Sequence, residues 1–294
     1  MSDLSGRTVL ITGANTGIGR ATTLALGARG ATLWLACRSE AKAREVMDAI
    51  GAAANRDVHF LRLDLGDLSS VRAAAASFLA DEGRPLHVLI NNAGLAGASG
   101  LTADGFEQTF GVNHLGHFLL TELLLDRLRA SAPSRVVNVA SKLHYRASGI
   151  DWDTLRSPTR KATSLARYQV SKLANVLHAK ELARRLEGTG VTTYSLHPGA
   201  IASDVWRNVP WPARSVMKLF MRSNEEGAAT SIHCATADDA GSETGLYYDE
   251  CAVREPSDLS KDVALQDELR DRSLTWVGLG SGLETSTDAS RAPL

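Results

Sequence analysis

Tyr168 and Lys172 lie four positions apart in the segment Tyr168-Gln-Val-Ser-Lys172. On a helix, residues i and i+4 share one face, so we expect the lysine ammonium to lie beside the phenol hydroxyl. A nearby cation favours phenolate and lowers the pKa of a tyrosine from its usual value of about 10. Such a tyrosine could exchange protons near neutral pH. The pair by itself is also compatible with a surface tyrosine packed on a lysine side chain.

A glycine-rich segment, Thr12-Gly-Ala-Asn-Thr-Gly-Ile-Gly19, follows a short apolar run and precedes a helical pattern. Glycines let the backbone turn tightly and approach a pyrophosphate, which rests on the helix N-terminus. The spacing is one residue longer than the usual dinucleotide fingerprint, but its place between a strand and a helix favours a dinucleotide site over an ordinary turn. The predicted cofactor-binding residues of this turn are Gly13, Asn15, Thr16, Gly17, Ile18 and Gly19.

Arg38 ends the second predicted strand, where NAD-binding folds often carry an acidic residue for the ribose 2′-hydroxyl. Cys37 occupies that acidic position, so NAD would lack one hydrogen bond. Arg38 offers a charge-assisted hydrogen bond to the 2′-phosphate of NADP. We therefore predict NADP(H) as the cofactor; the alternative is a solvated surface arginine.

Polar residues also end the next strands. Asn91-Asn-Ala-Gly94 closes the fourth predicted strand and Ser141 the fifth. The carboxyl ends of parallel strands form the ligand crevice of an open α/β sheet, so both are expected there, although Ser141 could simply cap a turn. Asn113 lies inside a long helical pattern, where asparagine is unfavourable and needs hydrogen-bond partners or a role.

The elements that must position these residues alternate between strands and helices. This alternation predicts an α/β fold, a doubly wound, Rossmann-like parallel sheet with helices on both faces, in a single domain over residues 1–279. A tail over residues 280–294 is expected to be disordered. The predicted strands are residues 8–11, 32–37, 58–65, 86–91, 135–139, 191–196 and 245–248. The predicted helices are residues 18–29, 40–52, 69–82 (begun by a serine), 106–131, 165–186, 223–236 (begun by a capping box) and 261–277.

Composition narrows the class of function. The net charge is −1 with both signs interspersed, which does not suit a nucleic-acid binder. The 3 cysteines are widely spaced, which predicts neither a metal site nor a disulfide framework and suits a reducing compartment. The sequence has no signal-peptide pattern and no transmembrane segment, so we expect a cytoplasmic protein.

Taken together and in this order, these motifs resemble the short-chain dehydrogenase/reductase family over about residues 5–278. Asp64 and Pro198-Gly199 complete the set. The retinol dehydrogenase-like branch is the more similar one; its membrane-bound members carry an N-terminal anchor, which we do not expect here. The strings that carry this closer resemblance are Cys37-Arg-Ser-Glu, Val112-Asn-His-Leu-Gly-His-Phe118, Ser171-Lys-Leu-Ala-Asn-Val-Leu177 and Leu196-His-Pro-Gly199.

The resemblance implies a role for each matching residue. Tyr168 would give a proton to the carbonyl oxygen as hydride arrives from the nicotinamide, and Lys172 would lower the tyrosine pKa and hold the nicotinamide ribose. Ser141 would hydrogen-bond the carbonyl, and Asn113 would position a water that connects Lys172 to solvent. The other implied cofactor contacts are Asp64 and Leu65 at the adenine, Asn91, Ala93 and Gly94 along the fourth strand, and Pro198, Gly199, Ile201 and Ser203 at the nicotinamide.

Residues 204–222 are apolar with interleaved basic side chains, and they follow the Pro198-Gly199 turn. A substrate lid over a lipophilic aldehyde, ketone or alcohol is the favoured interpretation. The alternatives are a helix packed on the core and a peripheral membrane contact. The whole protein is thus expected to be an NADP(H)-dependent oxidoreductase, with an idle NADP-binding regulator and a ketoreductase of natural-product biosynthesis as alternatives. Relatives often pair through residues 106–131 and 165–186, so a homodimer or homotetramer is expected.

Overall fold

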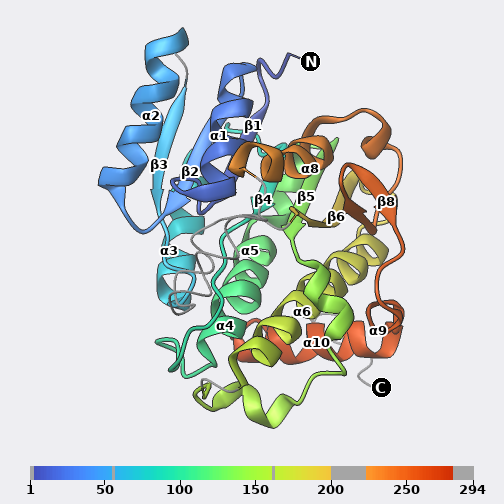
Figure 1. The fold of residues 1–294 in the computed structure, drawn as a ribbon. Coiled ribbons are helices and arrows are strands. Elements are labelled where there is room, and N and C mark those ends of the chain that lie inside the picture. Colours follow the sequence, from blue (N-terminus) through green and yellow to red (C-terminus); the bar gives the residue numbers. More distant parts are fainter. Residues whose placement is uncertain (1–2, 55–56, 161–162, 200–222, 281–294) are drawn as a thin grey trace, which may run out of the picture.

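The strands described between Thr8 and Arg254 form one sheet (Figure 1). The computed structural model describes residues 3–54, 57–160, 163–199 and 223–280. Its strands follow the order β3-β2-β1-β4-β5-β6-β7-β8, and only the last pair, β7 with β8, is antiparallel among the described strands. The strands are β1 (Thr8–Thr12), β2 (Thr32–Cys37), β3 (Val58–Arg62), β4 (Val88–Asn91), β5 (Ser134–Val139), β6 (Val191–His197), β7 (Leu246–Asp249) and β8 (Ala252–Arg254).

Helices cover both faces of this sheet (Figure 1). One face carries α1 (Gly17–Ala28), α2 (Glu40–Ala54) and α8 (Asn224–Thr236). The opposite face carries α3 (Leu68–Leu79), α5 (Gly116–Ala130), α6 (Ser164–Arg185) and, packed on α6, α10 (Val263–Trp276). The short helices are α4 (Gln108–Phe110), α9 (Asp258–Lys261), the 3₁₀ turns η2 (Lys142–Arg146), η3 (Trp152–Arg156) and η6 (Asp239–Gly241), and the π-helical turn η1 (Gly111–Leu115).

The core consists of two apolar layers, one on each face of the sheet. Alternate residues of β1 divide between them, because side chains along a strand point to opposite faces. Leu10 packs with the layer beneath α3, α5 and α6, whereas Val9 and Ile11 pack with the layer beneath α1, α2 and α8. Burial on both faces explains the continuous apolar runs of the central strands and confirms the predicted α/β fold.

The prediction of one long helix over residues 106–131 is wrong in the middle of that range. It is broken into α4, η1 and α5, and Asn113 lies in the π-helical turn. Two glycines flank the break at points of close approach: a Cβ on Gly111 would lie 2.4 Å from Thr102 Cγ2, and a Cβ on Gly116 would lie 2.5 Å from the Leu65 oxygen. A π turn inserts one extra residue into the helix, and a single turn of this kind is too short to be distinguished in an apolar pattern of this length.

Several helices and strands also begin or end at residues other than those predicted. Strand β3 ends at Arg62 rather than at residue 65, and helix α3 is capped by the Asp67 carboxylate, not by a serine. The last helix is interrupted at Asp262, which caps α10. The edge strand β8 was not predicted, while the capping box of Ser223 and Glu226 at the start of α8 is confirmed.

Helix α10 covers part of the α6 surface through which pairing was expected. Arg184 Nε donates to Gln266 Oε1 at 3.1 Å. On the neighbouring π turn, His114 Nε2 lies 3.0 Å from Ser273 Oγ. That part of the helical face is therefore occupied by the chain itself.

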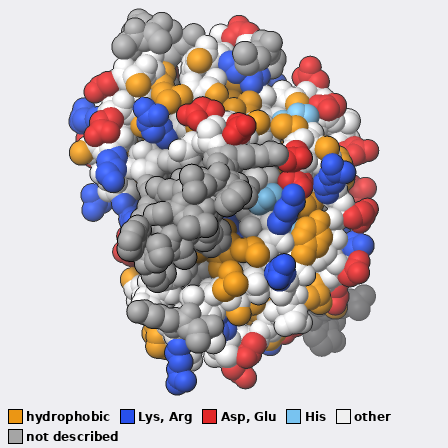
Figure 2. Space-filling model, viewed as in Figure 1, with side chains coloured by type: hydrophobic (Ala, Val, Ile, Leu, Met, Phe, Trp, Pro, Cys, Tyr) orange, Lys and Arg blue, Asp and Glu red, His pale blue; other side chains and the backbone are white. Residues whose placement is uncertain are grey.

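The visible surface carries both charges, with Lys, Arg, Asp and Glu side chains interspersed over its described part (Figure 2). No helix within the described ranges has the length and apolar character needed to cross a bilayer.

Candidate active site

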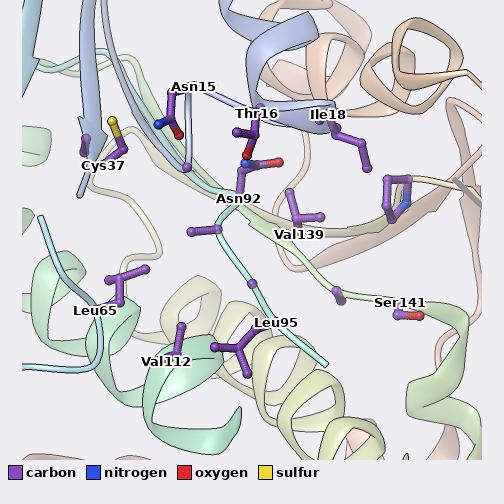
Figure 3. Close-up of a pocket in the computed structure, with 18 of the residues that line it drawn as sticks. Asn15, Thr16, Ile18, Cys37, Leu65, Asn92, Leu95, Val112, Val139 and Ser141 are labelled. Carbon is purple, nitrogen blue, oxygen red and sulfur yellow. The ribbon is translucent and has the colours of Figure 1, made fainter. Parts of the chain in front are cut away.

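A cavity of about 570 Å³ lies at the carboxyl ends of the parallel strands. It sits where β1 neighbours both β2 and β4, the point at which the strand order reverses and where open α/β sheets bind ligands. Cys37 marks one end of the cavity and Ser141 the other, with Asn15, Thr16 and Ile18 on one side and Leu65, Leu95 and Val112 on the other (Figure 3).

The glycine turn between β1 and α1 forms one wall of this cavity. Gly13 and Gly17 have φ values of +65° and +53°, which favour glycine. At Gly19 a Cβ would lie 2.2 Å from the Gly13 oxygen and 2.5 Å from Asn92 Nδ2, so no side chain fits. Within the described part of the chain, the N-cap residue Thr16 makes no side-chain cap hydrogen bond at α1, whose first amides therefore suit an anionic group. The wall thus fits the pyrophosphate of a dinucleotide.

The Thr12 hydroxyl joins this turn to the loop after β4. Thr12 Oγ1 accepts hydrogen bonds from the backbone amides of Asn92 and Ala93, both at 2.9 Å, and lies 2.8 Å from His117 Nε2. The side-chain Nδ2 of Asn92 in turn donates to the Thr12 carbonyl oxygen at 2.9 Å. These bonds set the distance between the two loops that enclose the cavity, a role that sequence patterns did not predict.

Asn91 does not reach the cavity, contrary to prediction. Its amide nitrogen donates to Thr121 Oγ1 at 3.0 Å and to Asn138 Oδ1 at 2.9 Å, within the core between β4, β5 and α5. Asn92, one position later, lines the cavity instead. The reason is the alternation of side chains along a strand, which sends neighbouring residues to opposite sides.

Tyr168 and Lys172 both line the cavity from one face of α6. Both side chains are buried, because α6 packs against β5 and the π turn. Lys172 Nζ donates to the Val139 carbonyl oxygen at 2.8 Å and lies 5.6 Å from the centre of the Tyr168 ring. The predicted juxtaposition on a helix face is therefore present.

The ionisation of this pair differs from the sequence prediction. Burial raises the pKa of Tyr168 to about 12, although a hydrogen bond with Ser141 opposes that shift. Burial also lowers the pKa of Lys172 to about 7. Burial disfavours both charged forms, and a lysine that is partly neutral near pH 7 stabilises phenolate less than a full ammonium would. The expected lowering of the tyrosine pKa is thus absent, and Tyr168 holds its proton at neutral pH.

The pKa of Lys172 predicts a pH-dependent contribution to stability. A lysine in the unfolded chain has a pKa of about 10.4, so between pH 7 and pH 10 the unfolded state binds one more proton than the folded state. The free energy of unfolding of the wild type should therefore rise, relative to Lys172→Met, by up to about 1.4 kcal/mol per pH unit. Urea denaturation at pH 7, 8 and 9 measures this difference. Lys42→Met, which replaces an exposed lysine, is the control. If the difference in the free energy of unfolding between the wild type and Lys172→Met stayed constant from pH 7 to pH 9, Lys172 would not have a lowered pKa in the folded protein.

Ser141 lines the cavity at the start of η2. Its Oγ accepts the Leu143 backbone amide at 3.2 Å, so it is a helix cap as well as a cavity residue. The two interpretations of this serine are therefore compatible. Because the oxygen accepts the Leu143 amide, the hydroxyl hydrogen is left to donate, and the oxygen of Tyr168, to which Ser141 is hydrogen-bonded, is one acceptor for it.

Asn113 lies behind the cavity wall rather than on it. Its Oδ1 accepts the Leu95 amide at 2.9 Å, and its Nδ2 donates to the Leu95 carbonyl and to Ser171 Oγ, both at 3.0 Å. Its backbone oxygen lies 3.1 Å from His117 Nδ1. Asn113 thus holds the loop after β4 in place.

The end of the cavity near β2 is cationic. Arg38, Ser39 and Lys42 line it, and Arg38 and Lys42 are exposed. Asp64 lines the neighbouring wall, where its Oδ1 accepts the Gly66 amide at 3.0 Å. Sequence reasoning missed Lys42, although its position in the first turn of the helix that follows Arg38 could have indicated it.

The remaining predictions divide between the cavity and the undescribed part of the chain. Leu65, Ala93, Gly94, Pro198 and Gly199 line the cavity with the glycine turn. Ile201, Ser203, the lid at 204–222 and nearly all of the tail at 280–294 lie outside the described residues. Sequence reasoning did not predict several other lining residues: Leu63, Leu95, Val112, Val139, Ala140 and His197.

Comparisons with known proteins agree with this geometry. The family model described as short chain dehydrogenase matches residues 7–150. Human retinol dehydrogenase 12 is 47% identical over 255 residues, covering 84% of this chain and 79% of that protein. An uncharacterized Mycobacterium paratuberculosis protein has a TM-score of 0.75 at 32% identity, covering 95% of this chain and 96% of its own. Pseudomonas aeruginosa RhlG, in an NADP active-site complex, has a TM-score of 0.68 at 26% identity over 83% of this chain and 94% of its own.

Sequence similarity to retinol dehydrogenases across most of both chains, together with the shared doubly wound sheet, leaves one assignment. The chain belongs to the short-chain dehydrogenase/reductase family of oxidoreductases, in its retinol dehydrogenase-like branch.

Proposed function

We propose that this protein is an NADP(H)-dependent oxidoreductase that interconverts a lipophilic aldehyde or ketone and its alcohol, with Tyr168 as the acid and base. The family uses a nicotinamide cofactor. One observation carries the proposal: Ser141, Tyr168 and Lys172 line the same cavity as the glycine turn. A proton donor and a dinucleotide wall therefore share one space, as a carbonyl reduction requires.

The chemistry follows from the protonation of these residues. A bound nicotinamide would supply the hydride. Tyr168, which burial keeps protonated, donates its phenol proton to the carbonyl oxygen as negative charge develops there. The Ser141 hydroxyl donates a second hydrogen bond to the same oxygen and stabilises that charge. Lys172, whose Nζ donates to the Val139 carbonyl oxygen, would bind the nicotinamide ribose and return a proton to Tyr168.

NADP(H) is proposed over NAD(H) because the cavity end near β2 carries Arg38 and Lys42 and no carboxylate other than Asp64 among the described lining residues. A 2′-phosphate would gain charge-assisted hydrogen bonds from these cations. At the same end, Asp64 and Leu65 would contact the adenine. Ala93 and Gly94 would flank the ribose, and Pro198 and Gly199 the nicotinamide.

Reversing the charge at position 38 should change the preference for NADPH over NADH. Arg38→Asp is expected to lower the ratio of the NADH Kd to the NADPH Kd by about 10- to 100-fold, since charge-assisted hydrogen bonds contribute about 1.5–3 kcal/mol. Fluorescence titration with both cofactors measures the ratio. Arg44→Asp is the matched control, because Arg44 pairs with Glu40 on the exposed side of α2 and lies outside the cavity lining. An unchanged ratio in Arg38→Asp would show that Arg38 does not bind the phosphate.

The substrate class rests on the apolar wall beside Ser141 and on the relatives. Leu95 and Leu143 line the cavity near the proposed acid, and the similar human protein is named a retinol dehydrogenase. A lipophilic carbonyl would bury its chain against such a wall. The test is NADPH oxidation by the purified protein with nonanal, benzaldehyde and retinal. Turnover of any of them supports the proposal, whereas tight NADPH binding without turnover of a broad carbonyl panel would favour an NADP-binding regulator.

A further inference from the structure

The 3₁₀ turn η2, which begins directly after Ser141, is bonded to the last residue of β7 and to the segment after that strand. Lys142 Nζ forms an ion pair with Asp249 Oδ2 at 2.8 Å. His144 Nε2 lies 3.1 Å from the Ser257 backbone nitrogen, and the Tyr145 hydroxyl donates to the Glu255 carbonyl oxygen. Three side chains within four residues thus join the Ser141 turn to a distant part of the chain.

Of these three side chains, that of His144 also contacts Ser141. Its Nδ1 lies 2.7 Å from the Ser141 carbonyl oxygen, which also accepts the His144 backbone amide at 3.0 Å. The Ser257 amide can only donate, so Nε2 must accept and Nδ1 must carry the proton. The imidazole is therefore a neutral ring of one tautomer that donates to Ser141, and burial lowers its pKa in agreement with that form.

The ring has little freedom to move away from this position. It is fully buried, and its centre lies 4.0 Å from that of Tyr145 and 4.8 Å from that of Tyr247. Ser141 has an extended backbone, with φ −167° and ψ 152°, and its hydroxyl oxygen is oriented by the amide two residues later. A bond to the Ser141 carbonyl from a fixed ring therefore orients the peptide that carries the hydroxyl.

We propose that His144 is a positioning residue for Ser141: its Nδ1–H holds the Ser141 carbonyl, and the Ser257 amide selects the tautomer that can do so. The inference rests on the proposed function, in which the Ser141 hydroxyl stabilises the carbonyl oxygen. His144 does not line the cavity and does not touch the reacting atoms. Its effect on the reaction passes through Ser141 alone, because small displacements of an oriented donor lower the rate steeply.

Three substitutions of His144 distinguish the effect of its hydrogen bond to Ser141 from that of its hydrogen bond to Ser257. His144→Phe keeps an aromatic ring and removes both bonds, and it should lower kcat about 10- to 100-fold with the Kd of NADPH unchanged. His144→Asn places an amide N–H where Nδ1 lies and needs no tautomer selection, so kcat should stay within about threefold of the wild type. His144→Gln reaches toward Ser257 instead and should behave like His144→Phe. His87→Phe is the matched control. It also removes a histidine that accepts a backbone amide, that of Thr8 at 3.0 Å, but His87 does not line the cavity.

A double-mutant cycle tests whether the effect passes through Ser141. In the Ser141→Ala background, His144→Phe should lower kcat by less than about twofold. A full additional loss in that background, or equal losses in His144→Asn and His144→Phe, would overturn the positioning role. If Ser141→Ala itself left kcat unchanged, the proposed function of Ser141 would fail instead, so the two failures are distinguishable. If His144→Phe does not fold, the comparison of His144→Asn with His144→Gln decides the question.

Discussion

Replacing Tyr168 by phenylalanine is expected to lower kcat by about 10³-fold or more while leaving the Kd of NADPH nearly unchanged. The substitution removes only the hydroxyl from a buried ring that lines the cavity, so the wall and its packing remain. Burial raises the pKa of Tyr168 to about 12, which keeps the proton on the phenol until negative charge develops on the substrate oxygen. Without that proton the developing alkoxide has no acid, and the barrier to hydride addition rises.

Stopped-flow or steady-state NADPH oxidation measures kcat for the most active carbonyl of the panel, and fluorescence titration measures NADPH binding. Tyr248→Phe is the matched control. It removes a hydroxyl from a tyrosine of β7 that packs against Tyr194 and is absent from the cavity lining. Residual turnover of Tyr168→Phe within tenfold of the wild type would rule out the acid role.

Ser141→Ala is expected to lower kcat by about 10²- to 10³-fold, with a small change in KM. The hydroxyl oxygen already accepts the Leu143 amide, so its hydrogen is directed away from the turn and can serve the substrate oxygen. A donor that strengthens its bond as charge develops stabilises the transition state more than the bound substrate, which is why kcat changes and KM does not.

Ser195→Ala provides the control for this second variant. Ser195 is buried in β6, and its hydroxyl has no hydrogen-bond partner among the described residues. The free energy of unfolding of both variants should be compared, because Ser141→Ala also loses a helix cap. A rise in KM with kcat unchanged would mean that Ser141 binds substrate without stabilising the transition state.

Several features of the site depend on local rules and were predictable. The glycine turn depends on contacts that leave no room for a Cβ at Gly19. Arg38 follows β2 directly at the cavity, and Tyr168 and Lys172 share a helix face because of the i, i+4 spacing. Each of these follows from a strand end, a turn or one helical period.

The residues whose positions were predicted wrongly depend on contacts that are not local. Asn91 and Asn92 are adjacent and chemically identical, and only the register of β4 within the sheet decides which one faces the cavity. Asn113 was singled out correctly as a polar residue in an apolar helix, but its partners in the Leu95 loop and on α6 are remote in sequence. Spacing along the chain cannot give such partners.

The sequence by itself therefore determined the fold class, the dinucleotide wall and the helix that carries the tyrosine and lysine, because periodicity and glycine spacing act over short distances. Only the tertiary structure decided the protonation of Tyr168 and Lys172. The cost of burying a charge depends on every segment that packs around it, and these segments come from all parts of the chain. The same reason applies to His144, whose bond to Ser141 is oriented by an amide 113 residues later.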